Sequence, residues 1–599
     1  MKTRILLVVT ALLGMFSVQA QTPVTLQKLS NPITGGTLKP TAAGMLIFGD
    51  YNNDGKLDGF IAAGQGADTQ TLALYKNNGD YTFSSASVGE IMGVTRGSAA
   101  WIDFDNDGNL DLVVGGVMLG MPTVILYKNS GAPDYTFTEV QSASSVLPVS
   151  AIENQDHNPR VIYPLDYNND GWMDLLINGQ TSEDWQGMGR VVALFKNNHG
   201  TFEFQATPVD GSNFRGVNGG GVNVGDVNND GYVDILLSGY LDDVGGVTDL
   251  YINNKNGGFT RASSPTFTGH QEGENFFIDV NNDGWQDIIE IGRDIKNGWS
   301  GFTNLFINNQ GSGFTKTTNP FGGGSAVIAI GDINNDGNMD VMTAGYASNA
   351  KIAYGKGDGT FTSVALPNDE QARGGFINFV DMNNDNSLDM TIFGYSDGAG
   401  GFINNFYKAT GAPANAAPAV PANATYSGSN GKYILTWDKS TDDHTATNAI
   451  RYNVAFTFPD GKKFTYVPAD PATGKIKVNG LQAFIISNSI EVNVPEGTKF
   501  AVQAVDQAGV GSAFSAVKTI GTGIKDLAVN SVKVFAADKR IAINNEGKTV
   551  KYSILSINGQ TVQSGVCTGK TLSAPLASGV YLVKVTDGNA VQTTKVTVF

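Results

Sequence analysis

The chain has 599 residues, which is too long for one hydrophobic core and indicates several domains. It contains 75 glycines, few charged residues (16%) and a formal net charge of −17. The glycine content suits an all-β protein with many tight turns, and the negative charge argues against nucleic acid or an anionic membrane as a partner. The single cysteine, Cys567, excludes an internal disulfide framework and cysteine-based zinc sites.

The first residues have the pattern of a secretory signal peptide. Lys2 and Arg4 precede a short apolar run at residues 5–16, and small residues up to Ala20 form a cleavage site. We therefore expect residues 1–20 to be removed and the protein to be secreted or held on the outer cell surface. An uncleaved membrane anchor is the alternative, but the run is shorter than the ~20 residues that span a bilayer. No other stretch is a candidate transmembrane segment.

One nine-residue pattern, Asp-x-[Asn/Asp]-x-Asp-Gly-x-x-Asp, recurs at intervals of 49 to 63 residues. Each copy follows a short extended stretch and precedes a β-branched run, an aromatic strand and a Phe-Thr-like strand. Four short strands per unit are typical of a propeller blade, so we expect a seven-bladed β-propeller over residues 21–412. Residues 24–28 are expected to complete the last blade and close the ring, with an open solenoid as the alternative. The copies begin at Asp50, Asp103, Asp166, Asp226, Asp279, Asp332 and Asp381.

The repeated loop has the donor pattern of a calcium site. Positions 1, 3 and 5 offer side-chain oxygens, position 6 is a turn glycine, position 7 offers its carbonyl and position 9 a carboxylate. We expect about seven structural Ca²⁺ ions, although Asx-rich turns that bond only to themselves are the alternative. In the seventh copy Asn386 replaces the glycine and should tolerate the left-handed conformation. The expected ligands are Asp50, Asn52, Asp54, Lys56, Asp58; Asp103, Asp105, Asp107, Asn109, Asp111; Asp166, Asn168, Asp170, Trp172, Asp174; Asp226, Asn228, Asp230, Tyr232, Asp234; Asp279, Asn281, Asp283, Trp285, Asp287; Asp332, Asn334, Asp336, Asn338, Asp340; and Asp381, Asn383, Asp385, Ser387, Asp389.

These seven loops between short strands resemble the FG-GAP (or VCBS) repeats of integrin-α-like propellers. The resemblance covers about residues 22–412. It implies that each metal loop joins the first two strands of a blade on one face of the propeller, and that loops on the other face carry ligand recognition. Members of that family include adhesins, lectin-like binders and accessory parts of polysaccharide-degrading systems.

Two further β-modules follow a Pro/Ala-rich linker at residues 413–421. Residues 422–521 alternate like strands around Trp437, which we expect in a core, and resemble a fibronectin type III β-sandwich. Residues 525–599 contain an Ile-Asn-Gly-Gln turn and the run Leu-x-x-Gly-Val-Tyr-Leu-Val-Lys-Val. They resemble the C-terminal sorting domain of type IX secretion in Bacteroidetes, which implies the type IX machinery as a partner; an ordinary packing module is the alternative.

No catalytic constellation stands out, because no Gly-x-Ser-x-Gly elbow sits on a strand-to-helix turn and no HExxH motif occurs. We therefore predict a non-enzymatic binding module that recognises a glycan or an extracellular protein. The alternatives are a lyase-like polysaccharide-active enzyme and a structural surface spacer. His157 and His270 are expected on solvated loops. Candidate ligand-binding residues, each of which could instead pack between blades, are Arg96, Arg160, Trp185, Arg215, Trp299 and Arg373.

Overall fold

The computed structural model confirms the all-β class. The one helical element among the described residues is a short 3-10 turn, η1 (Ile295–Asn297), and no described helix is long and apolar enough to cross a membrane. The predicted signal peptide, residues 1–20, lies outside the described part of the chain. The structure describes residues 23–34, 44–63, 71–118, 121–140, 162–180, 190–217, 220–241, 243–318, 320, 325–346, 348–366, 371–480, 485–521, 532–537, 539–587 and 590–598.

Each repeat folds into one sheet, whose strands pair antiparallel in chain order with two exceptions: β2 is an extra, parallel strand, and the outer strand of the last sheet is β1 from the start of the chain. Sheet 1 contains β2 (Ile33–Thr34), β3 (Gly44–Gly49), β4 (Asp58–Ala63), β5 (Thr71–Asn77) and β6 (Phe83–Ala86). Sheet 2 contains β7 (Thr95–Ile102), β8 (Asp111–Met118), β9 (Met121–Asn129) and β10 (Phe137–Glu139). Sheet 3 contains β11 (Ile162–Leu165), β12 (Asp174–Gln180), β13 (Arg190–Asn197) and β14 (Phe202–Gln205).

The remaining four repeats follow the same plan. Sheet 4 contains β15 (Val222–Gly225), β16 (Asp234–Leu241), β17 (Gly245–Asn253) and β18 (Phe259–Arg261). Sheet 5 contains β19 (Gln271–Ile278), β20 (Asp287–Asp294), β21 (Ser300–Asn308) and β22 (Phe314–Thr318). Sheet 6 contains β23 (Ser325–Gly331), β24 (Asp340–Tyr346), β25 (Ser348–Gly355) and β26 (Phe361–Ala365). Sheet 7 contains β27 (Arg373–Val380), β28 (Asp389–Ser396), β29 (Gly401–Thr410) and β1 (Thr25–Lys28).

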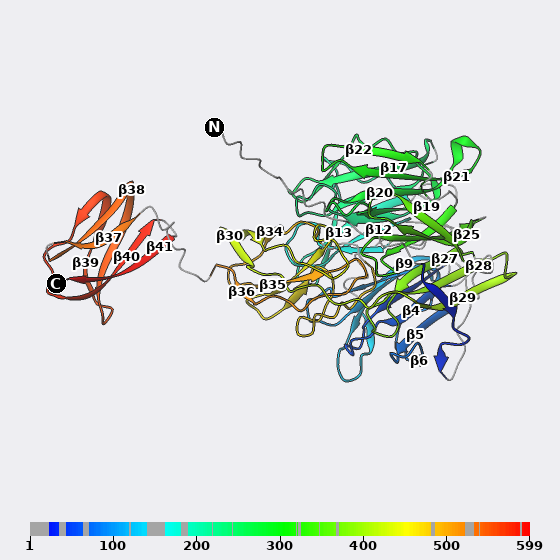
Figure 1. Cartoon of the computed structure of the whole chain (residues 1–599), viewed down its shortest axis with the longest axis horizontal. Helices are drawn as coiled ribbons and strands as arrows, with labels where there is room; N and C mark the ends of the chain where they lie inside the picture. Colours follow the sequence, from blue (N-terminus) through cyan, green and yellow to red (C-terminus); the bar gives the residue numbers. More distant parts are fainter. Residues whose placement is uncertain are drawn as a thin grey trace, which may run out of the picture.

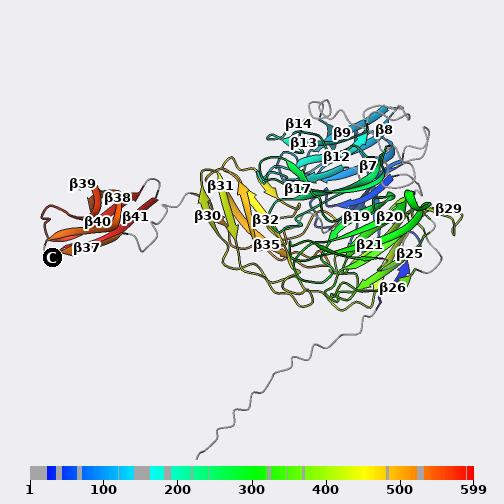
Figure 2. The same cartoon turned by 90° about the horizontal axis from the view of Figure 1, so that it is seen from above.

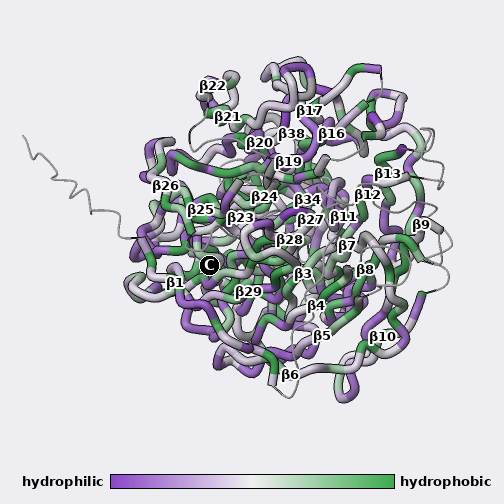
Figure 3. The backbone as a smooth tube through the Cα atoms, turned by 90° about the vertical axis from the view of Figure 1, so that its right-hand side faces the viewer, coloured by the Kyte–Doolittle hydropathy of each residue, from purple (hydrophilic) through white to green (hydrophobic). Residues whose placement is uncertain are grey.

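The seven sheets surround a common centre (Figure 3), and we call them together the ring. Their first strands lie side by side in chain order, and β27 of sheet 7 lies beside β3 of sheet 1. The expected strand at residues 24–28 is present as β1, which pairs with β29 from Thr25 opposite Thr410 to Lys28 opposite Tyr407. The second strands are buried on both faces because a neighbouring sheet covers each side, so runs such as Asp234–Ile235–Leu236–Leu237 need no polar alternation.

Two smaller sheets form the middle module, residues 411–521, which lies against one side of the ring (Figures 1 and 2). One sheet contains β30 (Thr425–Ser429), β31 (Lys432–Thr436) and β34 (Ser489–Asn493). The other contains β33 (Lys463–Thr465), β32 (Arg451–Thr457), β35 (Lys499–Val505) and β36 (Lys518–Thr519). Trp437 is buried between them, as predicted, and the same apolar cluster continues into residues of sheets 2 and 3.

The C-terminal module has its own five-stranded sheet and its own apolar core. The long strand β38 is central because it pairs with three others, and Cys567 is fully buried beside it. A buried thiol of this kind behaves as a small apolar side chain. The strands are β37 (Lys533–Ala537), β38 (Arg540–Ser556), β39 (Thr561–Leu572), β40 (Gly579–Asp587) and β41 (Ala590–Val598).

Candidate metal centres

All seven acidic loops lie on one face of the ring, which we call the loop face. Each loop joins the first strand of its sheet to the second, and its ninth residue begins that second strand, as Asp58 begins β4. Position 4 is an asparagine in the left-handed conformation in every copy, and position 6 is left-handed as well, with φ of 81° at Gly55 and 66° at Asn386. Asparagine therefore does replace glycine in the seventh loop without a change of backbone conformation.

The carboxylates at positions 1 and 9 are fixed by backbone amides. In the first loop Asp50 accepts hydrogen bonds from the amides of Asp54 and Gly55, both at 2.9 Å, and the same pair of bonds recurs at position 1 of the other loops. Asp58 at position 9 accepts a 2.7 Å bond from the amide of Asn77, which ends the third strand. These bonds aim one oxygen-bearing side chain from each end of the loop toward its centre.

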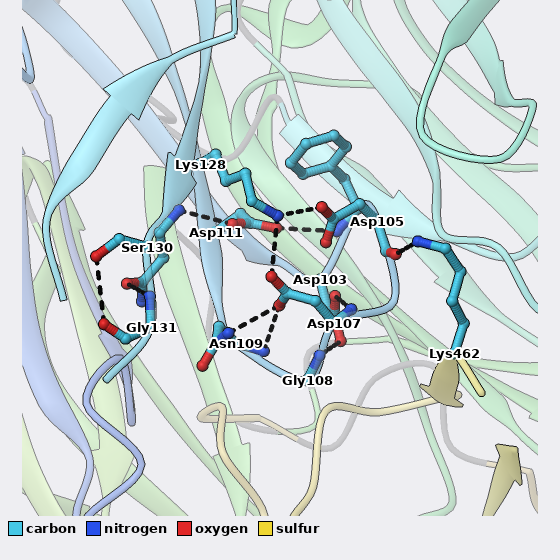
Figure 4. Close-up of polar contacts among 12 residues, drawn as sticks. Asp103, Asp105, Asp107, Gly108, Asn109, Asp111, Lys128, Ser130, Gly131 and Lys462 are labelled. Atoms are coloured by element: carbon cyan, nitrogen blue, oxygen red, sulfur yellow. Dashed lines mark hydrogen bonds and ion pairs between the residues drawn. The ribbon is translucent and has the colours of Figure 1, made fainter. Parts of the chain in front are cut away.

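The second loop shows the convergence most clearly (Figure 4). Asp103, Asp105 and Asp111 each place a carboxylate oxygen within 4.8 Å of the others. Oδ1 of Asp105 is buried and has no hydrogen-bond partner in the described part of the chain, while its Oδ2 contacts the ammonium group of Lys128. Lys128 also lies 2.9 Å from Asp107 Oδ2. The loop thus gathers three carboxylates, one of them with an unsatisfied oxygen, of the kind that a hard cation takes as ligands.

Burial makes these carboxylates costly when no cation neutralises them. All seven position-9 side chains are buried, and burial raises the pKa of Asp58 to about 8, of Asp287 to about 8 and of Asp389 to about 7. Burial likewise raises the pKa of Asp103, at position 1, to about 7. A doubly charged ion bound by oxygen would offset this cost, so the residues present fit the calcium site that the sequence predicts.

The sequence did not reveal the function of the position-4 asparagines, which connect neighbouring loops. Asn106 donates to the carbonyl of Gly171 at 2.9 Å, Asn169 to that of Gly231 at 2.7 Å, and Asn229 to that of Gly284 at 2.8 Å. Asn384 of the last loop donates to the carbonyl of Gly55 in the first at 2.8 Å. The recurrence of asparagine at a left-handed position in all seven copies is the signal that could have found this network.

The middle module covers the loop face. Lys462 donates to the carbonyl of Asp105 at 2.5 Å, and Lys477 donates to that of Gly108 at 2.7 Å. Asn493 donates to the carbonyl of Asn168 at 2.7 Å, and Tyr232 donates to Glu491 at 3.0 Å. Further contacts reach the fifth, sixth and seventh loops through Gln507 and Asn415. The loops are therefore contacts between the ring and the middle module as well as candidate metal sites.

Some side chains at position 7 contact the middle module, although the proposed metal site would use only the backbone carbonyl of this residue. Trp172 is buried against Phe458 of the middle module, with parallel rings 6.3 Å apart. Tyr232 is buried as well, through its bond to Glu491. Their aromatic character thus follows from the contact with the middle module.

We expect Asn169→Ala to lower the free energy of unfolding by about 2 kcal/mol more than Asn53→Ala. Asn169 and Asn53 are both left-handed, with φ of 55° and 56°, so placing alanine in this conformation costs the same free energy in the two variants. Asn169 is buried and also donates to the Glu491 carbonyl at 2.8 Å, whereas Asn53 is exposed and donates to Asn109 at 2.9 Å. Urea unfolding of the two variants measures the difference, and equal losses would contradict a stabilising link through Asn169.

The predicted ligand-binding residues that the structure describes belong to the opposite face, the turn face, where second strands lead to third strands and each sheet leads to the next. Arg160 and Trp185 lie outside the described residues, as does His157. Arg96 and Arg373 lie in β7 and β27; Arg373 is half-buried, and the side chain of Arg96 is outside the described part. The structure therefore brings no described pair of these residues into contact.

Arg215 and His270 have structural contacts that the sequence did not indicate. Nε of Arg215 donates to the buried carboxylate of Asp249 at 2.6 Å, and Arg261 donates to the other oxygen at 2.9 Å. His270, expected on a solvated loop, is instead fully buried and lies 2.9 Å from Asn275 Oδ1. The expectation for His270 is wrong because its backbone pairs with Val247 and draws the loop into sheet 4.

Trp299 is the exposed aromatic residue among the described candidates. It follows η1, has 41% of its surface exposed and adopts a left-handed conformation with φ of 63°. Arg293 supports it: the guanidinium carbon lies 5.1 Å from the ring centre, and Nε donates to the Trp299 carbonyl at 3.1 Å. A bulky residue at positive φ costs on the order of 1–3 kcal/mol, which is typical of positions that present a side chain for function.

Comparison with known families agrees with this architecture. The FG-GAP-like repeat family matches residues 50–114, 166–237, 279–343 and 332–392, and these four segments contain all seven loops. The secretion system C-terminal sorting domain family matches residues 537–598. The chain is thus an all-β protein built on FG-GAP-like repeats. It carries a type IX C-terminal sorting domain and is accordingly a secreted or cell-surface protein that uses the type IX machinery.

Solved structures give only weak likenesses, and no curated protein matches. The extracellular domain of a hybrid two-component system of B. thetaiotaomicron is 12% identical with a TM-score of 0.35, over 83% of this chain and 57% of that one. A second such domain from B. thetaiotaomicron is 9% identical with a TM-score of 0.33, over 97% and 59%. The FN1–FN3 domains of chicken CNTN1 are 13% identical with a TM-score of 0.14, over 45% and 97%. The chain therefore spans less than two thirds of the first of these proteins.

Proposed function

We propose that the chain is a non-enzymatic extracellular binding module, a seven-bladed β-propeller whose seven loops each hold a structural Ca²⁺ ion. The middle module is then a fibronectin type III-like sandwich fixed on the metal face. The closed order of first strands and the β1–β29 pairing support the propeller, and the buried carboxylates at positions 1 and 9 support the ions. Under this proposal the ions hold the first two strands of each blade together and do not take part in a reaction.

The ligand, a glycan or an extracellular protein, binds the turn face. The observation that carries this assignment is that the middle module contacts the loop face, so that the opposite face is the one that presents Trp299. An exposed indole ring stacks on sugar rings, and a nearby guanidinium donates hydrogen bonds to hydroxyl groups. We favour a glycan for this reason.

A glycan array with residues 21–599 in millimolar Ca²⁺ tests the proposal. We expect saturable binding to one class of glycan, a loss of about tenfold or more in Trp299→Ala, and no new products. Trp285→Ala is the matched control because Trp285 belongs to a loop on the other face. Unsaturated sugar ends in the digest would support the lyase alternative instead, and unchanged binding by Trp299→Ala would remove the assignment to this residue.

A further inference from the structure

Trp299 is held in place by a group of polar residues at the turn-face end of sheet 5. Nη1 of Arg293 donates to Glu272 Oε2 at 3.1 Å, and Nε of the same side chain donates to the Trp299 carbonyl at 3.1 Å. The guanidinium carbon also lies over one face of the indole ring, 5.1 Å from the ring centre. Arg293 therefore fixes both the backbone and the ring of Trp299, and a ligand that stacks on this ring must use its other face.

Both residues that Arg293 contacts have a left-handed backbone, with φ of 59° at Glu272 and 63° at Trp299. Glu272 lies in a bulge of β19, where the pairing with β20 shifts register. Strand β27 of sheet 7 has a bulge at the corresponding place, and its residue there is Gly374, a residue type that adopts left-handed conformations without strain. A glutamate at such a position implies that its carboxylate is needed, because strained non-glycine residues cluster at ligand sites.

The turn that carries Trp299 is fixed as well. The carboxylate of the buried Asp294 accepts hydrogen bonds from the amides of Lys296 at 2.9 Å and Asn297 at 3.3 Å. The Asp294 carbonyl accepts a further bond from the Trp299 amide at 2.9 Å. A side chain that is already ordered loses little conformational entropy on binding, so this indole ring is suited to stacking on a ligand.

The charges of this site balance. The turn and its supporting residues contain two acidic and two basic side chains: Glu272, Asp294, Arg293 and Lys296. Because Arg293 is paired with Glu272, it can donate hydrogen bonds to a hydroxyl group but exerts little net attraction on an anion. Lys296 extends along the neighbouring sheet, where its Cε would lie 3.2 Å from a Cβ on Gly245. The site therefore offers a ligand ring stacking and hydrogen bonds without a net positive charge.

Strands β19 and β20 also bury the carboxyl groups of Glu274 and Glu290, which add no attraction for an anion. We propose that the site at Trp299 takes a neutral saccharide and discriminates against uronic acids and sulfated sugars, and that Glu272 sets this preference by positioning Arg293 and balancing its charge. The preference rests on the glycan binding of the turn face and names the class of sugar. A neutral sugar ring stacks its C–H face on the indole, on the side opposite the guanidinium.

Oligosaccharides that differ only in charge test the proposal. A glycan array probed with residues 21–599 in millimolar Ca²⁺ should contain matched pairs for several linkages, such as β-1,4-mannotetraose with β-1,4-tetramannuronate and cellotetraose with β-1,4-tetraglucuronate. We expect the neutral member of each bound pair to bind about tenfold more tightly than its uronate counterpart.

Glu272→Gln keeps a hydrogen-bond acceptor beside Arg293 but leaves the charge of the guanidinium unbalanced. We expect this variant to reduce the preference for the neutral member by about fivefold, mainly through tighter binding of the uronate. Glu203→Gln is the matched control, because it removes the same charge from an exposed side chain of β14 in sheet 3. It should leave the preference unchanged.

Fluorine NMR of the chain labelled with 5-fluorotryptophan separates the positioning of the indole from a general effect on folding. The chain contains six tryptophans, and Trp299→Phe assigns the line of Trp299. Arg293→Lys keeps the charge but cannot bond to both Glu272 and the Trp299 carbonyl. In this variant the Trp299 line should shift and sharpen while the other lines stay in place, and an unchanged Trp299 line would overturn the positioning of the ring by Arg293.

The outcomes separate this proposal from the glycan-binding function itself. Equal or tighter binding of the uronate members, with binding still lost in Trp299→Ala, would overturn the preference for neutral sugars and leave the glycan-binding face in place. Failure of the folded wild-type chain to bind any saccharide would overturn both. The melting temperature of each variant shows that it is folded.

Discussion

Removal of divalent ions from the mature chain should lower the melting temperature of the ring and the middle module together, and leave that of the C-terminal module unchanged. Each proposed ion binds the folded state alone, so at about ten times its Kd it adds about 1.4 kcal/mol, and seven ions add about 10 kcal/mol. The expected fall in melting temperature is on the order of 10 °C. The middle module should melt with the ring because its side chains bond directly to the metal loops, as Lys477 does at Gly108.

Differential scanning calorimetry with and without chelator measures this effect. The C-terminal module is the internal control, since it has its own core and carries none of the loops. Re-addition of Ca²⁺ should restore the original melting temperature. Equal melting with and without chelator would contradict structural ions, and a separate, unshifted transition for the middle module would contradict its coupling to the loops.

Features with a local signal were predictable from the sequence. The nine-residue loop fixes its own donors, because alternating side chains at positions 1, 3 and 5 and a left-handed residue at position 6 are local properties of the chain. The order of strands within a repeat was predictable for the same reason. The strand β1 was predictable because an extended segment precedes the first repeat, while the last repeat lacks an outer strand of its own. The C-terminal module was recognisable from its own turn and strand residues.

Contacts between distant segments were not predictable, because one sequence carries no record of which surfaces meet. Nothing near Glu491 indicates that it accepts a hydrogen bond from Tyr232, which is 259 positions away. Arg215 was expected to bind ligand because its actual partner could not be identified from the sequence. That partner, Asp249, lies 34 positions later in a strand that is otherwise mostly apolar. That isolated carboxylate within a buried strand was a signal, because a buried charge needs a partner.

Replacement of Gly337 by alanine should destabilise the chain far more than replacement of Gly55, and should displace the middle module. Both glycines occupy position 6 of a metal loop with φ of 81°, so alanine costs about 1–2 kcal/mol of backbone strain at either site. At Gly55 a Cβ would meet nothing within 4 Å, whereas at Gly337 it would lie 2.0 Å from the backbone carbonyl oxygen of His444. A backbone atom cannot rotate away, so the module must shift or the loop must distort.

In Gly337→Ala the clash should lower the free energy of unfolding by about 1–3 kcal/mol beyond the backbone strain that both variants share. Urea unfolding gives the free energies, and limited proteolysis of residues 413–421 reports whether the middle module has moved, since Asn415 in that segment is buried and donates to Asp506 at 2.8 Å. We expect faster cleavage in Gly337→Ala and wild-type rates in Gly55→Ala. Equal stability and equal cleavage would mean that the middle module does not press on the sixth loop, and the assignment of the turn face as the free face would lose its main support.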